Sequence, residues 1–212
     1  MKIIQKICIF IGLLLLAAAA CLTSYNLWRE ARARASSAEA LAGLLTKMEK
    51  NTPDKTAADA LDEREIPDYL LNPEKDMPVE EINGQKYIGV LKIPDLSLEL
   101  PVISEWSYPA LRTAPCRYKG SIYQNNMIIA AHNYSTHFGN LKNLKQGAEV
   151  SFTDVDGNVF YYEVVEIETL NPYAIEEMES GDWDLTLFTC TLGGQSRVTV
   201  RCQQVQKTSA QD

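Results

Sequence analysis

The chain has 212 residues, a formal net charge of −8 and a hydrophobic content of 46%. This length allows one medium-sized domain with an appendage. No basic stripe occurs, which argues against a nucleic-acid partner. The five cysteines show no paired spacing such as CxxC, which argues against a disulfide framework or a zinc site.

The N-terminal segment is predicted to span a membrane. Residues 7–22 are apolar without interruption, slightly short of the ~20 residues that cross a bilayer. Tyr25 and Trp28 follow as aromatic anchors for the far interface. We therefore expect residues 1–28 to form a single-pass signal anchor. The alternatives are a cleaved signal peptide and a lipoprotein cleavage site at Cys21, which follows three alanines.

The charges that flank this segment do not favour one orientation. Lys2 and Lys6 precede it, but three arginines follow it at positions 29, 32 and 34. Counting basic residues therefore does not place the C-terminal part outside the cell. The short N-terminal tail and the chemistry of the domain, described below, favour export.

Residues 29–81 are expected to form a stalk. Residues 26–50 are rich in Ala, Leu, Glu and Arg and contain no proline, which predicts a helix. Ser36-Ser37 offers a second helix start, because serine caps free N–H groups. Residues 51–83 contain four prolines and most of the acidic excess, which predicts a linker with a short helix near residues 57–65. Such a stalk would hold the domain at a distance from the membrane.

Residues 82–207 have the pattern of an all-β domain, followed by a short C-terminal tail at 208–212. Short β-type runs are separated by turn signals, of which Asp156-Gly157 is the strongest hairpin signal. The expected strands are residues 87–93, 96–103, 121–123, 127–132, 149–153, 159–170, 184–190 and 197–205. Eight short strands with few helices predict a closed or nearly closed β-barrel.

Three residues at predicted strand ends carry the chemistry. Cys190 ends one apolar strand, His132 ends another, and Arg197 opens the last strand after a Gly-Gly turn. A thiol can attack a carbonyl, an imidazole can exchange protons, and a fixed cation can stabilise an oxyanion. Each residue alone has an ordinary explanation, as a small core residue, a turn residue and a solvated cation.

The remaining cysteines and the second histidine are weaker candidates. Cys202 shares the alternation register of Val198 and Val200, so we expect it in the core. Cys116 follows a proline and is expected in a loop. His137 lies in a polar loop and is the alternative base.

The segment around Cys190 resembles a known family. Thr-Leu-Phe-Thr-Cys, which ends at Cys190, is similar to the sortase signature Thr-Leu-x-Thr-Cys. His132 upstream and Arg197 downstream match the family in order and approximate spacing, although Ala131 stands where many sortases have glycine. The resemblance covers residues 85–206 and includes the stretches 88–94, 100–102, 111–120 and 138–144.

The resemblance implies an eight-stranded sortase-type β-barrel on the extracellular face of a Gram-positive-type membrane, with no cofactor. Its substrates would be secreted proteins with a C-terminal sorting signal that contains a Thr-Gly-like bond. Cys190 would form a thioacyl intermediate, His132 would serve as general acid and then base, and Arg197 would stabilise the oxyanion or hold the substrate. Thr189 would assist at the oxyanion site. An amine from a cell-wall precursor or a pilin would resolve the intermediate.

The segment between the last two predicted hairpins is expected to shape the substrate groove. Residues 171–183 leave room for a turn or one short helix, and the candidate contacts are Pro172, Tyr173, Ala174 and Ile175. Four nearby acidic residues could form a calcium site of the kind that some sortases use, but a solvated acidic loop is favoured, and we expect no metal: Glu176, Glu177, Glu179 and Asp182. The Asp-Pro lid motif of the pilus-polymerising class does not occur, so the subclass stays unassigned.

Two other functions remain open. A cell-wall cysteine peptidase or amidase would use the same thiol and imidazole, but its cysteine usually begins a helix, whereas the residues before Cys190 have a strand pattern. An inactive barrel that serves as a binding module is the non-enzymatic alternative. It is disfavoured because His132, Cys190 and Arg197 are all present.

Overall fold

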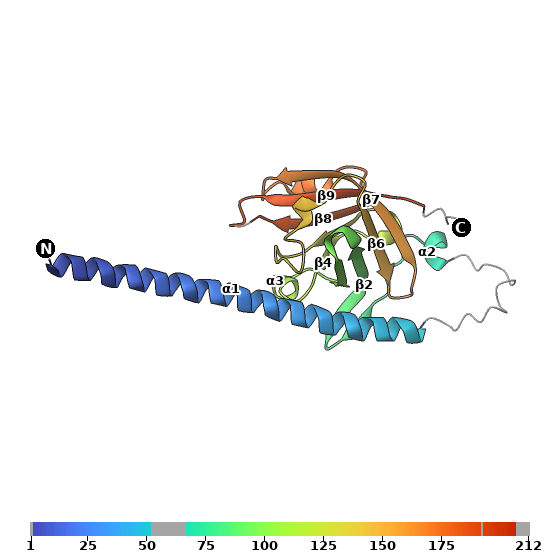
Figure 1. The fold of residues 1–212 in the computed structure, drawn as a ribbon. Coiled ribbons are helices and arrows are strands. Elements are labelled where there is room, and N and C mark those ends of the chain that lie inside the picture. Colours follow the sequence, from blue (N-terminus) through green and yellow to red (C-terminus); the bar gives the residue numbers. More distant parts are fainter. Residues whose placement is uncertain (1, 52–66, 192, 207–212) are drawn as a thin grey trace.

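The computed structural model describes residues 2–51, 67–191 and 193–206 (Figure 1). The short helix expected near residues 57–65 and the C-terminal tail at 208–212 lie outside these residues. The elements in chain order are α1 (Lys2–Asn51), α2 (Asp68–Leu71), β1 (Glu80–Ile82), β2 (Gln85–Ile93), η1 (Pro94–Leu96), β3 (Leu98–Ile103), α3 (Tyr108–Leu111), β4 (Cys116–Lys119), η2 (Ile122–Gln124), β5 (Met127–Ala130), η3 (Leu141–Asn143), β6 (Glu149–Asp154), β7 (Val159–Leu170), α4 (Ile175–Glu179), β8 (Leu185–Cys190) and β9 (Arg197–Gln204).

The strands close into a barrel. Their order is β1-β2-β3-β4-β5-β8-β9-β7-β6, and a further pairing between β2 and β6 joins the two sides. Strands β2 to β9 therefore form a closed ring of eight, while β1 adds to β2 as an outer hairpin strand. This confirms the eight-stranded barrel. Closure pairs every barrel strand on both sides, so none of these eight is left as an open edge.

Two details of the strand prediction were wrong. Residues 121–123 do not form a strand but contribute to the 3₁₀ helix η2, where the Ser121 hydroxyl accepts a hydrogen bond from the Tyr123 N–H at 3.2 Å. Cys116 does not lie in a loop but begins β4, paired with Ile103 on one side and Ala130 on the other. The sequence of β4, Cys-Arg-Tyr-Lys, is short and largely polar, so its strand conformation depends on these tertiary pairings.

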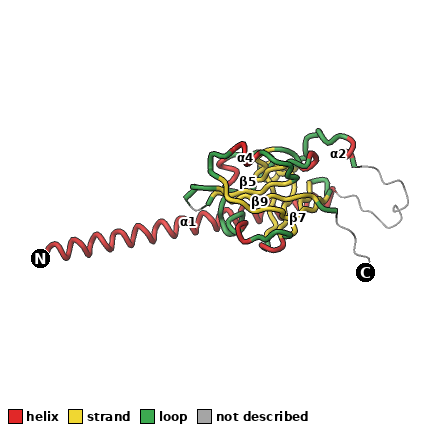
Figure 2. Tube along the Cα trace, turned by 90° about the horizontal axis from the view of Figure 1, so that it is seen from above, coloured by secondary structure: helices red, strands yellow, loops and turns green. Residues whose placement is uncertain are grey.

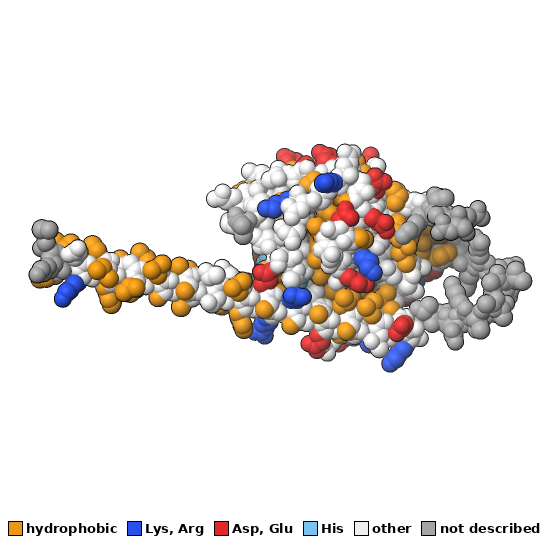
Figure 3. Space-filling view, in the orientation of Figure 1, with side chains coloured by type: hydrophobic (Ala, Val, Ile, Leu, Met, Phe, Trp, Pro, Cys, Tyr) orange, Lys and Arg blue, Asp and Glu red, His pale blue; other side chains and the backbone are white. Residues whose placement is uncertain are grey.

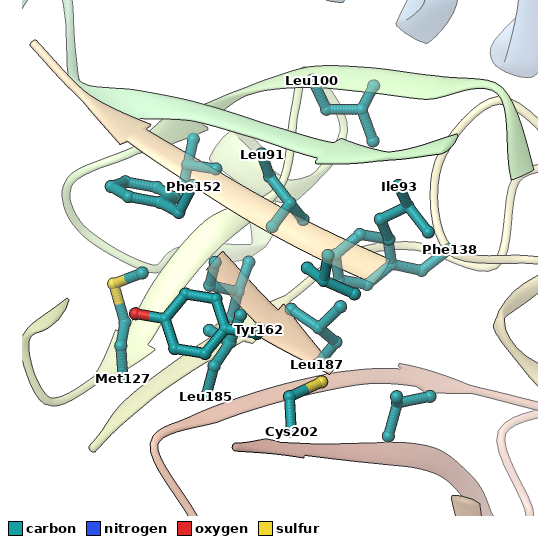
Figure 4. Packing of buried hydrophobic residues seen from close by; sticks show 14 of the residues in the cluster. Leu91, Ile93, Leu100, Met127, Phe138, Phe152, Tyr162, Leu185, Leu187 and Cys202 are labelled. Atoms are coloured by element: carbon teal, nitrogen blue, oxygen red, sulfur yellow. The ribbon is translucent and has the colours of Figure 1, made fainter. Parts of the chain in front are cut away.

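Apolar side chains fill the barrel interior (Figure 4). Alternate residues of each strand point inward, as the pleat requires, and Leu91, Leu185 and Leu187 are fully buried. Cys202 is also fully buried on the inner side of β9, as its register predicted. A second apolar cluster lies outside the barrel wall, between the sheet, α1, α3 and α4.

Helix α1 is continuous from the predicted membrane segment into the domain (Figures 1 and 2). No new start occurs at Ser36-Ser37. Within the described residues it is the one helix long and apolar enough to cross a membrane, and its N-terminal half projects away from the barrel with exposed apolar side chains (Figure 3).

The C-terminal half of α1 packs along the barrel instead of forming a stalk. Ala33, Ala40, Leu44 and Met48 recur at helical spacing and are buried against the domain, where α1 contacts β1, β2 and β3. Lys47 adds an ion pair to Glu80 at 2.9 Å. The barrel therefore lies beside the point where the apolar part of α1 ends, and not at the distance that a stalk over residues 29–51 would give.

Candidate active site

The ends of β5 and β8 bring His132 beside Cys190. These two strands are parallel, with Ala130 opposite Phe188. The Ala131 N–H continues the ladder by donating to the Phe188 carbonyl at 3.1 Å. Parallel strands end at the same edge of a sheet, and neighbouring strands lie about 4.8 Å apart. His132 therefore follows Ala131 at the edge where Cys190 ends β8.

The other side of Cys190 is occupied by Arg197. Strands β8 and β9 are antiparallel, and Cys190 is the direct partner of Arg197 in their register. The connecting turn contains Gly193 and Gly194, which have φ values of 84° and 70°, a conformation that glycine adopts without strain. The structure thus places the thiol on the strand between the imidazole and the guanidinium.

Arg197 has an unused donor directed into the structure. Its guanidinium carbon lies 5.4 Å from the centre of the Phe188 ring, a distance at which a cation and an aromatic face attract. Its Nε is buried and has no hydrogen-bond partner among the described residues. A buried N–H without a partner is costly, and no acceptor for this donor occurs among the described residues.

The imidazole of His132 is kept mostly neutral by its surroundings. Burial lowers the pKa of His132, and the nearby positive charges of Arg29 and Arg112 lower it further. Both effects disfavour the imidazolium form. At neutral pH the ring is therefore ready to accept a proton, which is the state that a general base needs.

Thr189 is buried, and its hydroxyl is already committed. It donates to the Ala131 carbonyl at 2.8 Å. This bond ties the C-terminal end of β8 to the residue that precedes His132. The side chain of Thr189 therefore holds the two strand ends together, and does not point toward the exposed Cys190 thiol.

His137 has a different environment from His132. It is completely buried, and neither ring nitrogen has a hydrogen-bond partner among the described residues. Burial lowers its pKa to about 4, with His132 contributing in the same direction. Its ring packs on Tyr134, which in turn packs on His132, with centroid distances of 5.6 and 5.1 Å. Its burial separates it from any substrate, so the geometry favours His132 as the base.

The cysteines of the barrel also differ in burial. Burial raises the pKa values of Cys116 and Cys202 to about 12, so both remain protonated thiols at neutral pH. Cys190 is the exposed cysteine of the barrel. The two other exposed cysteines, Cys8 and Cys21, lie in the projecting part of α1.

The segment between β7 and β8 lies next to the site and is held by Arg201. The Arg201 guanidinium donates to the carbonyls of Glu177 and Met178 at 2.6 and 2.8 Å and to the Thr186 hydroxyl at 3.1 Å. It also pairs with Glu168 at 2.8 Å. This role could not be predicted from the sequence, because the partners include two main-chain carbonyls that only the fold brings together.

The four candidate contact residues of this segment are not equivalent. Tyr173 is 88% exposed and Ile175 is 50% exposed, so both are free to meet a ligand. Ala174 packs on the outer apolar cluster, and Pro172 is half-buried.

The acidic residues of this segment were considered as a calcium site. Among them, Glu179 forms an ion pair with Lys119. Within residues 2–51, 67–191 and 193–206, no group of three His, Cys, Asp or Glu side chains is placed to hold a metal.

A row of aromatic rings, which the sequence did not indicate, leads away from the site. Phe188 packs on Tyr118 at 5.4 Å, Tyr118 on Trp106 at 5.9 Å, and Trp106 on Tyr108 at 5.1 Å between centroids. The row begins beneath Arg197 and ends at Tyr108, which is 70% exposed. It offers an apolar surface to an extended ligand whose reacting bond lies at Cys190.

A closed barrel that presents a thiol between an imidazole and a guanidinium has the groups required for acyl transfer through cysteine. Residues 91–205, more than half of the chain, match the family model of the sortase domain. The chain belongs to the sortase family.

Individual relatives support this assignment. The chain is 29% identical over 115 residues to sortase A of Bacillus anthracis, a region that covers 51% of this chain and 54% of that protein. The chain thus spans about half the length of the curated relative that it matches. Among solved structures, sortase C1 of GBS pilus island 1 has a TM-score of 0.52 and 21% identity, covering 62% of this chain and 70% of that one. Sortase C1 from Streptococcus suis has a TM-score of 0.51 and 22% identity, covering 59% and 76%. These likenesses concern the fold and not the sortase class.

Proposed function

We propose that this protein is a transpeptidase that cleaves a C-terminal sorting signal on secreted proteins and joins the new C-terminus to an amine. The observation that carries the proposal is the position of Cys190 between His132 and Arg197 on neighbouring strands. The amine would come from a cell-wall precursor or a pilin, and the membership in the sortase family supports both partners as classes.

In the first half-reaction, the sulfur of Cys190 attacks the carbonyl carbon of the scissile bond. The neutral imidazole of His132 takes the thiol proton, and the guanidinium of Arg197 stabilises the oxyanion. The carbon–nitrogen bond then breaks, and His132 returns the proton to the leaving amine. A thioester on Cys190 remains.

In the second half-reaction, an acceptor amine attacks this thioester. His132 accepts a proton from the amine, a new carbon–nitrogen bond forms, and the carbon–sulfur bond breaks. His132 then gives this proton to the departing sulfur, which restores the Cys190 thiol and the neutral imidazole. Thr189 would assist by fixing the two strand ends through its bond to Ala131.

The substrate groove is proposed to run over the outer barrel wall beside the segment between β7 and β8. Exposed Tyr173 and Ile175 would contact the sorting signal directly, while Pro172 and Ala174 would shape the segment that presents them. The aromatic row from Phe188 to Tyr108 would form the opposite wall.

The location is proposed as the outer face of the cell membrane. Residues 1–28 would anchor the chain with a single span, supported by the exposed apolar half of α1. The catalytic part would comprise residues 82–207. Because α1 packs on the barrel, the site would lie close to the membrane surface.

Product analysis tests the proposal. The full-length protein in detergent is incubated with peptides that carry varied sorting motifs, with and without an amine acceptor, and products are identified by mass. A transpeptidase gives an amine-linked product in addition to hydrolysis. Hydrolysis that never yields an amine-linked product would favour a peptidase or amidase instead. Peptide binding without any cleavage would favour a binding module.

A further inference from the structure

Three arginines line one cavity where α1 reaches the barrel. The cavity has a volume of about 380 Å³ and lies between the α1 residues Arg29 and Arg32 and the loop residue Arg112. No carboxylate lines it, and among the described residues none of the three guanidinium groups forms an ion pair. Figure 3 shows basic side chains where the helix meets the domain. The cavity therefore concentrates positive charge that no protein group neutralises.

Aromatic residues direct two of these arginines toward the apolar end of the helix. Arg29 lies over the ring of Tyr25 at 5.8 Å and Arg32 over the ring of Trp28 at 5.5 Å. Each aromatic residue precedes its arginine by one helical turn, so each guanidinium is held back toward the N-terminus of α1. Tyr25 and Trp28 themselves are residues of the kind that occupy a membrane interface.

The end of the cavity at Tyr25 lies at the height of the headgroup layer of a bilayer. The apolar run of α1 ends at Leu22, and a helix rises 1.5 Å per residue, so Arg29 lies about 10 Å beyond the hydrocarbon edge. The headgroup layer extends roughly 5–8 Å beyond that edge. A guanidinium that points back along the helix reaches this layer.

We propose that the cavity binds the phosphate of an anionic lipid headgroup from the membrane that α1 spans. The inference rests on the proposed membrane topology but not on the proposed reaction. Lipid phosphate supplies the negative charge that the three arginines lack, and arginine forms strong paired hydrogen bonds to phosphate. The contact would fix the orientation of the barrel relative to the bilayer.

The proposal also accounts for the basic residues that follow the apolar segment. Lys and Arg are normally concentrated on the cytoplasmic side of a span, yet Arg29 and Arg32 lie on the side that carries the barrel. Their position in the cavity gives these arginines a role in lipid binding, which is separate from setting the orientation of the membrane span. Arg29 and Arg112 are also the positive charges that lower the pKa of His132. A phosphate bound to them would therefore act electrostatically on His132.

Lipid titration of the full-length protein in detergent, read by native mass spectrometry, tests this inference. Phosphatidylglycerol and phosphatidylcholine are titrated separately against the wild type, Arg29→Gln, the double variant Arg29→Gln/Arg112→Gln, and Arg34→Gln. Arg34 is the matched control, since it is exposed on the same helix and does not line the cavity. Detergent offers no extended anionic surface, so only a basic residue in contact with the headgroup contributes, by about fivefold in binding.

We expect the wild type to prefer phosphatidylglycerol, with binding about fivefold weaker in Arg29→Gln and about thirtyfold weaker in the double variant. Arg34→Gln should bind as the wild type does. If Arg29→Gln lowers the melting temperature, the exposed Arg32→Gln replaces it with the same expected loss.

Three results would overturn the proposal. Equal losses in Arg29→Gln and Arg34→Gln would reduce the effect to general surface charge. Displacement of the lipid by millimolar inorganic phosphate would make the cavity a site for small soluble anions. Displacement by an acidic peptide would assign it to a protein segment. Since no peptide cleavage is measured, these outcomes are independent of whether the transpeptidase reaction is correct.

Discussion

Replacing Arg201 with methionine should release the segment between β7 and β8 and destabilise the barrel. The guanidinium makes hydrogen bonds to Glu177, Met178 and Thr186 and an ion pair with Glu168. Its side chain is only 3% exposed, whereas that of Glu168 is 29% exposed. Breaking a buried charged pair from one side costs about 3–5 kcal/mol. Because Glu168 retains some contact with water, we expect about 3 kcal/mol, at the lower end of that range.

Urea denaturation of the full-length protein measures this loss, with Lys92→Met as the matched control. Lys92 pairs with Glu99 at 3.4 Å, and both side chains are exposed at 54% and 41%, so its removal should cost no more than about 0.5 kcal/mol. The Arg201 variant should also show a raised KM for a sorting peptide, because the segment that presents Tyr173 and Ile175 loses its anchor. If Arg201→Met were no less stable than Lys92→Met, the anchoring argument would be wrong.

Three further predictions concern the site and its surroundings. Arg197→Ala should lower kcat about 10²–10³-fold, as the loss of an oxyanion donor does, with an unchanged melting temperature; peptide turnover at wild-type rates would remove Arg197 from the mechanism. Arg112→Gln removes a positive charge that lowers the pKa of His132, so the acid limb of the rate profile should move to higher pH, and an unmoved limb would contradict the electrostatic assignment. His137 has a folded pKa of about 4, below its unfolded value of about 6.5. The unfolded state therefore binds the proton first, and stability should fall by about 3 kcal/mol as the pH drops from 6.5 to 4. His137→Phe should abolish much of this dependence, and an identical pH profile of unfolding in both proteins would contradict it.

The sequence predicted those strands whose residues carry their own pattern. The bounds expected for residues 159–170 agree with β7, and the buried register of Cys202 follows from simple alternation. Strand β4 was missed because its four residues have neither alternation nor a run of β-branched side chains. Its conformation comes from its neighbours β3 and β5, which are distant in sequence.

The packing of α1 could be predicted only in part. The composition of residues 26–50 indicates a helix, and Ala33, Ala40, Leu44 and Met48 mark one of its faces. Without the position of the barrel, that face has no partner, and a free stalk is the natural expectation. The contact with β1, β2 and β3 depends on the chain returning after residue 66.

The candidate site, like α1, could be predicted only in part. Residue types and strand-end positions were enough to single out Cys190, His132 and Arg197. Their arrangement depends on β8 lying between β5 and β9, which is a matter of strand order that local patterns do not encode. The lowered pKa of His132 and the anchoring role of Arg201 depend on neighbours from other elements, so neither could be read from the sequence.

Peptide mapping of the trapped acyl-enzyme tests whether Cys190 is the nucleophile. The full-length protein is mixed with a cleavable sorting peptide, quenched in acid before the amine is added, digested and analysed by tandem mass spectrometry. We expect one thioester adduct, on Cys190, that disappears when amine is supplied before the quench and is absent in Cys190→Ala. An adduct on Cys116 or Cys202, or continued cleavage by Cys190→Ala, would contradict it.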